Sequence, residues 1–449
     1  MKQNFAKWIR SVTQSFAREI RWLTPGLGVK RWIGLILIGA FSIGIGLVVL
    51  VLGVYQSGPN SWLEAILYFI SLEFISRPIR ILIYIGFGVL IIGIGIAGLN
   101  RAILRPFIHP GKPVIETVSA YRKKERGPRI VTIGGGNGLA SILRGLKNHT
   151  NNLTAIVTVA DDGGSSGELR KAIGILPPGD IRNCLTALSN DERLLTQLFQ
   201  YRFAAGAGLN GHNLGNLFIT ALTEITGSFE EALAESGRVL AISGKVLPST
   251  LHDVRLVANI AMTDQVKTIV VRGESQIPKI NGKIQRVWLE PSNPLGFPPA
   301  IQSILAADLI IVGPGSLYTS ILPNLLVPDI ASAIKASRAL KFYICNVATQ
   351  RGETDGFQCG DHIRVINQHI GGHIFDLMIC NNNFQGSLSS GVDWVIPEDN
   401  LEEEQVIYKA DLIDVENPWR HNSEKIARVI MDLFYERTGP LLFREDEYS

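Results

Sequence analysis

The chain has 449 residues, of which 46% are hydrophobic, and its formal net charge at pH 7 is only +3. So small a charge, carried mostly by cations that flank apolar segments, does not predict a nucleic-acid-binding surface. The four cysteines, at positions 184, 345, 359 and 380, have no C-x-x-C spacing. The sequence therefore predicts neither a zinc site nor a disulfide framework.

Two long apolar runs lie in the first hundred residues. Residues 33–54 and 81–99 contain no charged side chain, and at about 1.5 Å per residue each can cross a hydrocarbon core of about 30 Å as a helix. We therefore expect a transmembrane helical hairpin whose glycines let the two helices pack closely. These glycines are at positions 39, 44, 46, 53, 86, 88, 93, 95 and 98. A cleaved signal peptide is the alternative for the first run, but a long basic segment precedes it.

Basic residues outside the two runs predict the orientation of the hairpin. Between the runs the only cations are Arg77 and Arg80. The positive-inside rule then makes the chain an integral membrane protein with both termini and the large domain in the cytoplasm. The flanking cations are Lys2, Lys7, Arg10, Arg18, Arg21, Lys30 and Arg31 before the first run, and Arg101, Arg105, Lys112, Arg122, Lys123, Lys124, Arg126 and Arg129 after the second. Residues 62–70 are amphipathic, which fits a position in the outer interface or a plain connecting helix.

The rest of the chain divides into a linker, one large domain and a short tail. The hairpin with its flanks spans residues 1–104, and residues 105–128, basic and rich in proline, form a linker that suits an anionic membrane surface. In residues 129–437, strand-like runs alternate with helical stretches, which predicts a doubly wound, mostly parallel α/β sheet. The strand-like runs are residues 130–133, 153–159, 309–312, 342–345 and 377–380.

Two segments of the large domain depart from that alternation. Residues 246–290 contain short strand-like runs at 255–262, 267–271 and 284–289, so we expect a small β-rich insertion there. Apolar residues at helical spacing predict a last helix over residues 420–437. Residues 438–449 form the tail.

A glycine-rich turn follows the first strand-like run of the domain. It consists of Gly134, Gly135, Gly136, Asn137 and Gly138 and leads into a helix, an arrangement whose backbone N–H groups bind phosphate. The G-x-G-x-x-G fingerprint fails, because Leu139 or Ser141 occupies its last position, and no P-loop lysine follows. A nicotinamide enzyme and a P-loop NTPase are therefore disfavoured, and a tight turn without a ligand is the alternative.

Two polar turns follow the second strand-like run. The first, residues 161–167, begins with Asp161 and Asp162, which can bind Mg²⁺ together with a substrate phosphate or accept hydrogen bonds from sugar hydroxyls. A solvated Asp-Gly turn is the alternative. The second, residues 176–183, carries Asp180, Arg182 and Asn183 on a proline-stiffened turn. Arg182 suits an anion, although it could equally pair with Asp180 on a helix surface.

Further along, residues 211–216 and 313–320 are the remaining candidates from spacing alone. His212 could be an acid, a base or a phosphate donor beside Asn213 and Asn216, or Asn213 could cap a helix next to a structural histidine. The second segment repeats the strand, glycine turn and helix pattern with Gly313, Gly315 and Ser316. Two such turns at the carboxyl ends of strands can face one crevice and bind a diphosphate, with residues 346–354 as a third loop of its rim.

Six motifs occur together in the order GGGNG, VTVADDGGSSG, LPPGDIRNCL, GHNLGN, IVGPGSLYTSILPNLL and CNVATQRGET. This set resembles the gluconeogenesis factor family, relatives of 2-phospho-L-lactate transferase, over about residues 129–437. The family has threonine where this chain has Asn137, so a hydroxyl contact there is missing. The resemblance implies a Rossmann-like α/β fold that binds a nucleotide or a UDP-sugar. It also implies that Arg420, in a C-terminal motif of the family, contacts the diphosphate.

The two branches of this resemblance imply different functions. The regulatory branch, whose motifs match better, implies a protein that binds UDP-N-acetylglucosamine and supports cell shape and envelope precursor supply during gluconeogenic growth. The transferase branch implies an enzyme that moves a phosphorylated group from a nucleotide diphosphate carrier with Mg²⁺, through Asp161 or Asp162 and Arg182. For either branch we expect a homo-oligomer, with envelope-synthesis proteins as partners of the regulatory form, and neither NAD nor zinc as a cofactor.

Overall fold

The computed structural model describes residues 30–52, 75–104, 124–189, 193–262, 267–398 and 405–439. The chain divides into two compact units, residues 1–120 and 121–449, which are described separately below. Several expectations fall outside the described residues: the end of the first apolar run at 53–54, the amphipathic segment 62–70, most of the linker, and the tail from residue 440 onward.

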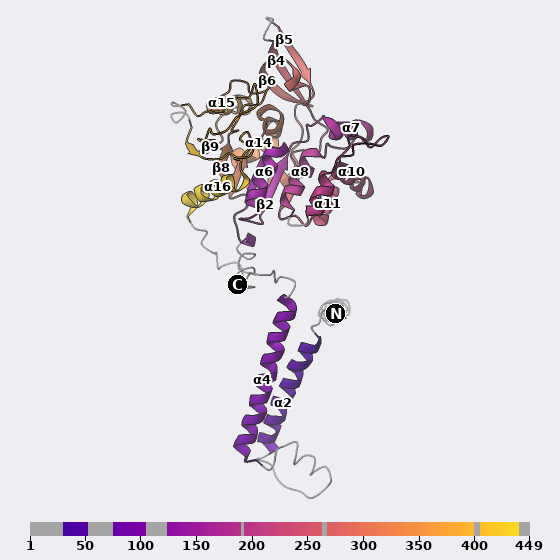
Figure 1. Cartoon of the computed structure of the whole chain (residues 1–449), viewed down its shortest axis with the longest axis vertical. Helices are drawn as coiled ribbons and strands as arrows, with labels where there is room; N and C mark the ends of the chain where they lie inside the picture. Colours follow the sequence, from indigo (N-terminus) through magenta and orange to yellow (C-terminus); the bar gives the residue numbers. More distant parts are fainter. Residues whose placement is uncertain are drawn as a thin grey trace, which may run out of the picture. The chain divides into compact units, whose positions relative to one another are not determined.

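The N-terminal unit contains two helices that pack against each other, α2 (Lys30–Leu52) and α4 (Arg77–Leu104) (Figure 1). Glycines allow a close approach: a Cβ on Gly39 would lie 2.9 Å from the carbonyl oxygen of Gly88, and a Cβ on Gly88 would lie 2.9 Å from that of Gly39. Gly95 and Gly98 also face α2, whereas a Cβ on Gly44, Gly86 or Gly93 would meet no atom within 4 Å. The expected glycine packing therefore holds for part of the set.

The two helices differ in how well they match a membrane span. In α4, residues Ile81–Leu99 have a mean hydropathy of 2.5 and only 11% of them are buried, so this stretch is long and apolar enough to cross a membrane. In α2 the apolar stretch whose side chains are described, Gly34–Ile45, is shorter, whereas the apolar run in the sequence covers residues 33–54. Length and composition thus support one span among the described residues, and the two-span hairpin stays a prediction.

The C-terminal unit is built on a seven-stranded parallel sheet in the order β10-β9-β8-β7-β1-β2-β3. The chain enters at β1, the third strand from the β3 edge, builds outward to β3, and returns to β7 on the other side of β1 before building outward to β10. Its direction of growth therefore switches between β1 and β7. This order confirms the predicted doubly wound α/β fold. The strands are β1 (Ile130–Gly134), β2 (Leu153–Val157), β3 (Lys245–Pro248), β7 (Leu309–Val312), β8 (Leu340–Ile344), β9 (Leu377–Asn381) and β10 (Ile407–Ala410).

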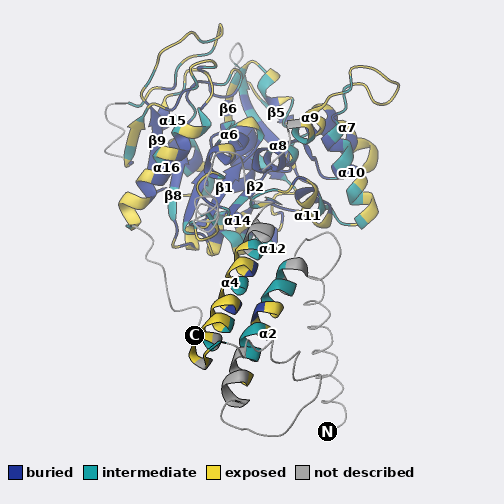
Figure 2. Cartoon of the chain, turned by 60° about the horizontal axis from the view of Figure 1, so that its bottom comes forward, coloured by how far each residue is buried: buried dark blue, intermediate teal, exposed yellow. Residues whose placement is uncertain are grey.

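Helices surround the sheet, and the core lies between them. All residues of β1, β7 and β9 are buried, as their continuous apolar runs require. Figure 2 shows the large sheet mostly in dark blue, while the surrounding helices carry exposed residues. These helices are α6 (Gly136–Leu146), α7 (Gly164–Ile173), α8 (Gly179–Leu188), α9 (Arg193–Gln200), α10 (Leu214–Thr226), α11 (Phe229–Val239), α12 (Pro298–Leu305), α13 (Leu322–Leu325), α14 (Pro328–Ala336), α15 (Cys359–Ile370) and α16 (Ser423–Thr438).

The β-rich insertion is a three-stranded antiparallel sheet, which we call the small lobe. Its order is β5-β4-β6, with β4 (Arg255–Met262) between β5 (Thr268–Arg272) and β6 (Gly282–Glu290). Figure 1 shows it at one end of the α/β unit. The lobe starts later than the expected residue 246, because residues 245–248 form β3 and pair with β2 at the edge of the large sheet.

Candidate functional site

The first glycine turn connects β1 to α6 at the point where the strand order switches. Gly135 is extended and precedes α6; a Cβ there would lie 2.6 Å from Asp180 Oδ2 and 3.0 Å from Thr158 Cγ2. Gly136 has a φ of +62°, in the left-handed region that favours glycine. A Cβ on Gly138 would lie 2.5 Å from the carbonyl oxygen of Pro314, so this turn packs directly against the second one.

The second glycine turn follows β7, the neighbouring strand. Gly313 has a φ of +83°, and a Cβ there would lie 2.8 Å from the carbonyl oxygen of Ile344. Asn346 fixes Gly315 with two hydrogen bonds: its Oδ1 accepts from the Gly315 N–H at 3.2 Å, and its Nδ2 donates to the Gly315 carbonyl at 2.9 Å. The structure therefore brings the two predicted turns together, with a residue of the third predicted loop bracing them.

On one side of the turns lies a cavity of about 680 Å³, which we call the basic cleft. Its walls include Asn137, Gly138, Gly315 and Ser316 of the two turns, together with Asn183 and Asn213. Arginines dominate its charge: Arg144, Arg182, Arg202, Arg351 and Arg420. Within the part of the chain that the structure describes, the cleft is lined by no Asp or Glu, and none of these arginines forms an ion pair.

Arg182 is the best fixed of these arginines. Its Nη1 donates to Asn216 Oδ1 and its Nη2 to Asn183 Oδ1, both at 2.8 Å, while its Nε is buried without a partner among the described residues. Burial and the nearby Arg202 lower the pKa of Arg182 to about 10, so the side chain is still cationic at neutral pH. It is thus held by amides and not paired with Asp180, and its charge is available to an anion in the cleft.

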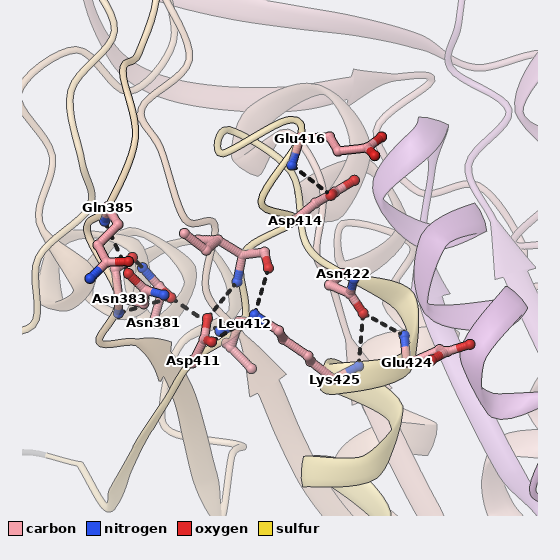
Figure 3. Close-up of polar contacts among 11 residues, drawn as sticks. Asn381, Asn383, Gln385, Asp411, Leu412, Asp414, Glu416, Asn422, Glu424 and Lys425 are labelled. Atoms are coloured by element: carbon pink, nitrogen blue, oxygen red, sulfur yellow. Dashed lines mark hydrogen bonds and ion pairs between the residues drawn. The ribbon is translucent and has the colours of Figure 1, made fainter.

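Arg420 reaches the cleft on a segment that other side chains hold in place. The N-terminal cap of α16 is Asn422, whose Oδ1 accepts from the N–H groups of Glu424 and Lys425 at 3.0 Å. Lys425 in turn donates to Asp411 Oδ2 at 2.6 Å, and Figure 3 shows these contacts around the start of the helix. The last helix therefore begins at Ser423 and not at residue 420. Arg420 lies in the turn before it.

On the other side of the turns lies a smaller cavity of about 360 Å³, which we call the acidic chamber. It shares Asn137, Gly138, Gly315 and Ser316 with the basic cleft, so the two cavities adjoin at the glycine turns. Its ionisable lining residues, in the part of the chain that the structure describes, are the carboxyls Asp161, Asp180 and Glu274. Gly135, Gly136, Thr158, Thr319 and Ser320 complete its walls.

Burial and mutual repulsion raise the pKa values of these carboxyls. The pKa of Asp180 rises to about 6, because burial and then Asp161 disfavour its charge more than the Gly136 N–H and Arg182 stabilise it. Burial also raises the pKa of Asp161, against a hydrogen bond of 2.8 Å from the Gly163 N–H. The pKa of Glu274 rises to about 8 through burial and the surrounding acids, of which Asp161 is the strongest.

Several candidate residues from the sequence lie outside both cavities. Asp162 turns to the small lobe, where its Oδ1 accepts from the Ser275 N–H at 2.8 Å. His212 lies between Ser165 Oγ and Glu168 Oε2, each at 3.2 Å. Asn213, by contrast, lines the basic cleft, and it also caps α10, as one of the two interpretations predicted. Gly134 and Gly313 begin the two glycine turns, and Asn216 Oδ1 accepts a hydrogen bond from Arg182 Nη1.

Two acidic residues of the site carry no sequence signal of their own. Glu274 comes from the turn after β5, a segment without any recognisable motif. Glu353 is 5% exposed and stands behind the chamber, where its Oε1 accepts from Thr319 Oγ1 and Gln350 Nε2 at 3.0 Å. Burial raises the pKa of Glu353 to about 7. Only the loop that contains Glu353 was identified from the sequence.

The donor set suits Mg²⁺ only in part. Among the described residues, no group of three or more His, Cys, Asp or Glu side chains is arranged to bind a metal ion. Asp161 and Asp180 nevertheless face one cavity, and Asp161 raises the pKa of Asp180. Mg²⁺ commonly uses one or two carboxylates together with substrate phosphates. The residues therefore fit a magnesium ion that arrives with a phosphorylated ligand, through Asp161 and Asp180 in place of Asp162.

Comparison with known proteins gives consistent matches. The family model of 2-phospho-L-lactate transferase CofD matches residues 130–430. A putative gluconeogenesis factor of Nostoc sp. PCC 7120 is 45% identical over 92% of this chain and 91% of its own, and the gluconeogenesis factor of Bacillus subtilis is 46% identical over 69% and 99%. A crystal structure of a UPF0052 family member from Bacillus halodurans, 44% identical, covers 68% of this chain and 99% of its own with a TM-score of 0.63.

Proposed function

Because the chain belongs to the gluconeogenesis factor family and carries a CofD-type domain, we propose that it binds a nucleotide diphosphate sugar of the UDP-N-acetylglucosamine class. One observation carries this proposal. Two glycine turns meet where the strand order switches, and the cleft beside them is lined by five arginines that have no carboxylate partner among the described residues. In doubly wound sheets, this crevice is where nucleotides bind.

The diphosphate is the part of the ligand that these groups recognise. The N-terminus of α6 offers backbone N–H groups and the positive end of the helix dipole to a phosphate. Arg182 adds a preorganised guanidinium, and Arg144 and Arg420 lie near enough for Arg420 to lower the pKa of Arg144. A dianionic diphosphate in the cleft would relieve this repulsion between cations.

We further propose that binding serves envelope precursor supply and cell shape during gluconeogenic growth, and that the N-terminal hairpin anchors the domain to the membrane as an integral membrane protein. The names of the relatives support the link to gluconeogenic growth, and the apolar α4 helix supports the membrane anchor. The Nostoc alignment covers 92% of the chain, more than the α/β unit alone, so the N-terminal segment is shared at least in part. Growth and cell shape of a deletion strain on gluconeogenic carbon and on glucose, with and without an Arg182→Ala copy, test the role.

A second candidate function is transfer of a phosphorylated group from a nucleotide diphosphate carrier. The description of the matching family model and the two carboxyls beside the phosphate site favour it. Bound Mg²⁺ would supply charge neutralisation at the phosphates. In such an enzyme Arg182 would orient the diphosphate, and Asp161 and Asp180 would hold the Mg²⁺.

Calorimetric titration of the full-length chain in mild detergent tests the primary proposal. We expect UDP-N-acetylglucosamine to bind and NAD(H) to bind much more weakly. Arg182→Ala should weaken binding of the UDP-sugar. Arg338→Ala should not, because Arg338 is an exposed residue that precedes the amino end of β8, whereas the glycine turns follow the carboxyl ends of the strands. Absence of UDP-sugar binding, or tighter binding of NAD(H), would overturn the proposal. Release of a product during incubation with the ligand would favour the transferase instead.

A further inference from the structure

We propose that the acidic chamber is a charge filter, which accepts an uncharged, hydroxyl-bearing end of the ligand and rejects an end with a carboxylate or a terminal phosphate. We further propose that Glu274 of the small lobe is a specificity-determining residue of this filter. The inference rests on the proposed function, since it assigns the two ends of a nucleotide diphosphate sugar to the two cavities.

The opposite charges of the two cavities give the ligand one direction. The phosphates have their partners at the glycine turns and in the basic cleft, where the arginines lie. Whatever extends from the phosphates through the shared residues Gly138 and Gly315 enters a space lined by carboxyls and hydroxyls. Sugar hydroxyls can donate hydrogen bonds to such oxygens, whereas an anion would meet like charge in a partly desolvated space.

Glu274 is held in the chamber by contacts on both sides of it. Asp162 Oδ1 accepts from the N–H of Ser275, and a Cβ on Gly273, whose φ is +104°, would collide with Asp162 Oδ2. The acidic turn is thereby fastened to the loop that carries Glu274. Asp162 therefore acts as a positioning residue, which explains why it faces away from the ligand although Asp161 faces toward it.

Arg170 fastens the same turn to the base of the small lobe. Arg170 is 9% exposed. Its guanidinium donates to Asp253 and to the carbonyl of Val254, which lie just before β4. It also donates to the carbonyl of Asp161 at 3.2 Å. Asp161, Asp162, Asp180 and Glu353 are the charged groups that act on Glu274, and all four are acidic. The lobe thus places a fifth carboxyl among four others, an arrangement that hydrophobic packing alone does not require.

The experiment compares two ligands that differ only at C6 of the sugar: UDP-glucose, with a hydroxymethyl group, and UDP-glucuronate, with a carboxylate. We expect the full-length chain, titrated in EDTA so that no Mg²⁺ neutralises Asp161 and Asp180, to bind UDP-glucuronate at least about tenfold more weakly at pH 7.5. Asp180→Asn should narrow this ratio, and Glu274→Lys should narrow it further or invert it. Gln276→Lys adds the same charge on the exposed side of the same loop and is the matched control, for which the ratio should stay as in the wild type.

The outcomes separate this inference from the proposed function. Equal affinities for the two ligands in the wild type, or a ratio that neither Asp180→Asn nor Glu274→Lys changes, would overturn the filter while UDP-sugar binding stands. Failure of both ligands and of UDP-N-acetylglucosamine to bind would overturn both proposals. If Glu274→Lys does not fold, Glu274→Gln is compared with the wild type at pH 9. The affinity ratio of UDP-glucose to UDP-glucuronate must then be larger for the wild type than for this variant.

Discussion

The basic cleft and the acidic chamber share four wall residues and yet carry opposite charge. Asn137, Gly138, Gly315 and Ser316 belong to both, and these residues are neutral. Beyond them, the cleft has arginines without carboxylate partners among the described residues, and the chamber has carboxyls without cationic partners in its walls. In the part of the chain that the structure describes, the arginines and the carboxyls therefore stay on opposite sides of the glycine turns and form no ion pairs with one another across them.

This separation has a measurable electrostatic cost on each side. The pKa of Arg182 is lowered to about 10, and those of Asp180 and Glu274 are raised to about 6 and about 8. In each case the charged form is disfavoured by burial and by neighbours of the same sign. Groups perturbed in this way gather where a ligand supplies the missing partner. The separated charges therefore support the proposed ligand, which has an anionic part and an uncharged part.

The largest expected effect comes from separating the two glycine turns, which form the wall that the two cavities share. Gly138→Ala places a Cβ 2.5 Å from the Pro314 carbonyl oxygen, so the two turns must separate. We expect a loss of about 2–4 kcal/mol in stability and loss of detectable ligand binding, measured by thermal melting and calorimetry. Gly315→Ala is the comparison, because its Cβ would meet nothing closer than 3.4 Å. If Gly138→Ala melts and binds like the wild type, the turns do not form one rigid wall.

Removing one cation from the cleft should have the next largest effect. Arg182→Ala deletes a guanidinium that two asparagines hold in place, and loss of a charged hydrogen bond costs about 1.5–3 kcal/mol. We expect the affinity for a UDP-sugar to fall tenfold to a hundredfold, and less at high salt. Loss of a buried cation and loss of its hydrogen bonds to the two asparagines act on stability in opposite directions, so the melting temperature is measured beside the affinity. An unchanged affinity would place the diphosphate elsewhere.

Much of this arrangement could be predicted from the sequence, because local patterns specify it. Continuous apolar runs followed by glycine turns identified β1 and β7, and the strand order then places the turns side by side. The strands β3 and β10 were missed, because each has four residues and mixed burial, too short a pattern to distinguish from a turn. Their place at the two edges of the sheet explains that mixed burial.

The charge separation itself could not be predicted. Arg144, Arg202 and Arg351 reach the cleft from three separate segments, and Glu274 reaches the chamber from the small lobe. No motif joins them, so only the tertiary fold brings them together. Asp161 and Asp162 show a second limit: adjacent residues in an extended turn point in different directions, so a pair in the sequence need not be a pair in the site.

A smaller effect should distinguish Asp180, which lines the acidic chamber, from Asp162, which faces the small lobe. If Mg²⁺ joins the ligand to Asp161 and Asp180, then Asp180→Asn should weaken binding by about 1–3 kcal/mol in Mg²⁺ and less in EDTA. Asp162→Asn should lose about 1 kcal/mol of stability through its contact with Ser275, with the same effect on binding in both buffers. Titrations of both variants with Mg²⁺ and with EDTA provide the test. A Mg²⁺-dependent loss in Asp162→Asn would return that residue to the metal site.

The smallest expected effect concerns how the acidic chamber responds to pH. The pKa of Glu274 is about 8 in the folded state, above its ordinary value of 4.5, because burial and then Asp161, Glu353, Asp180 and Asp162 disfavour its charge. The folded state therefore binds more protons than the unfolded state between these values, so the stabilising contribution of protonated Glu274 is lost as pH rises through about 8.

Glu274→Gln should remove this dependence, since its side chain is neutral at every pH. Compared with the wild type, the variant should gain stability between pH 5.5 and pH 8.5, by at most about 3 kcal/mol, measured as the difference in urea midpoints at each pH. Gln276→Glu, on the exposed side of the same loop, is the control and should not alter the slope. Parallel curves for the wild type and Glu274→Gln would mean that Glu274 is already ionised at neutral pH, and the chamber would then owe its charge to all three of its carboxylates.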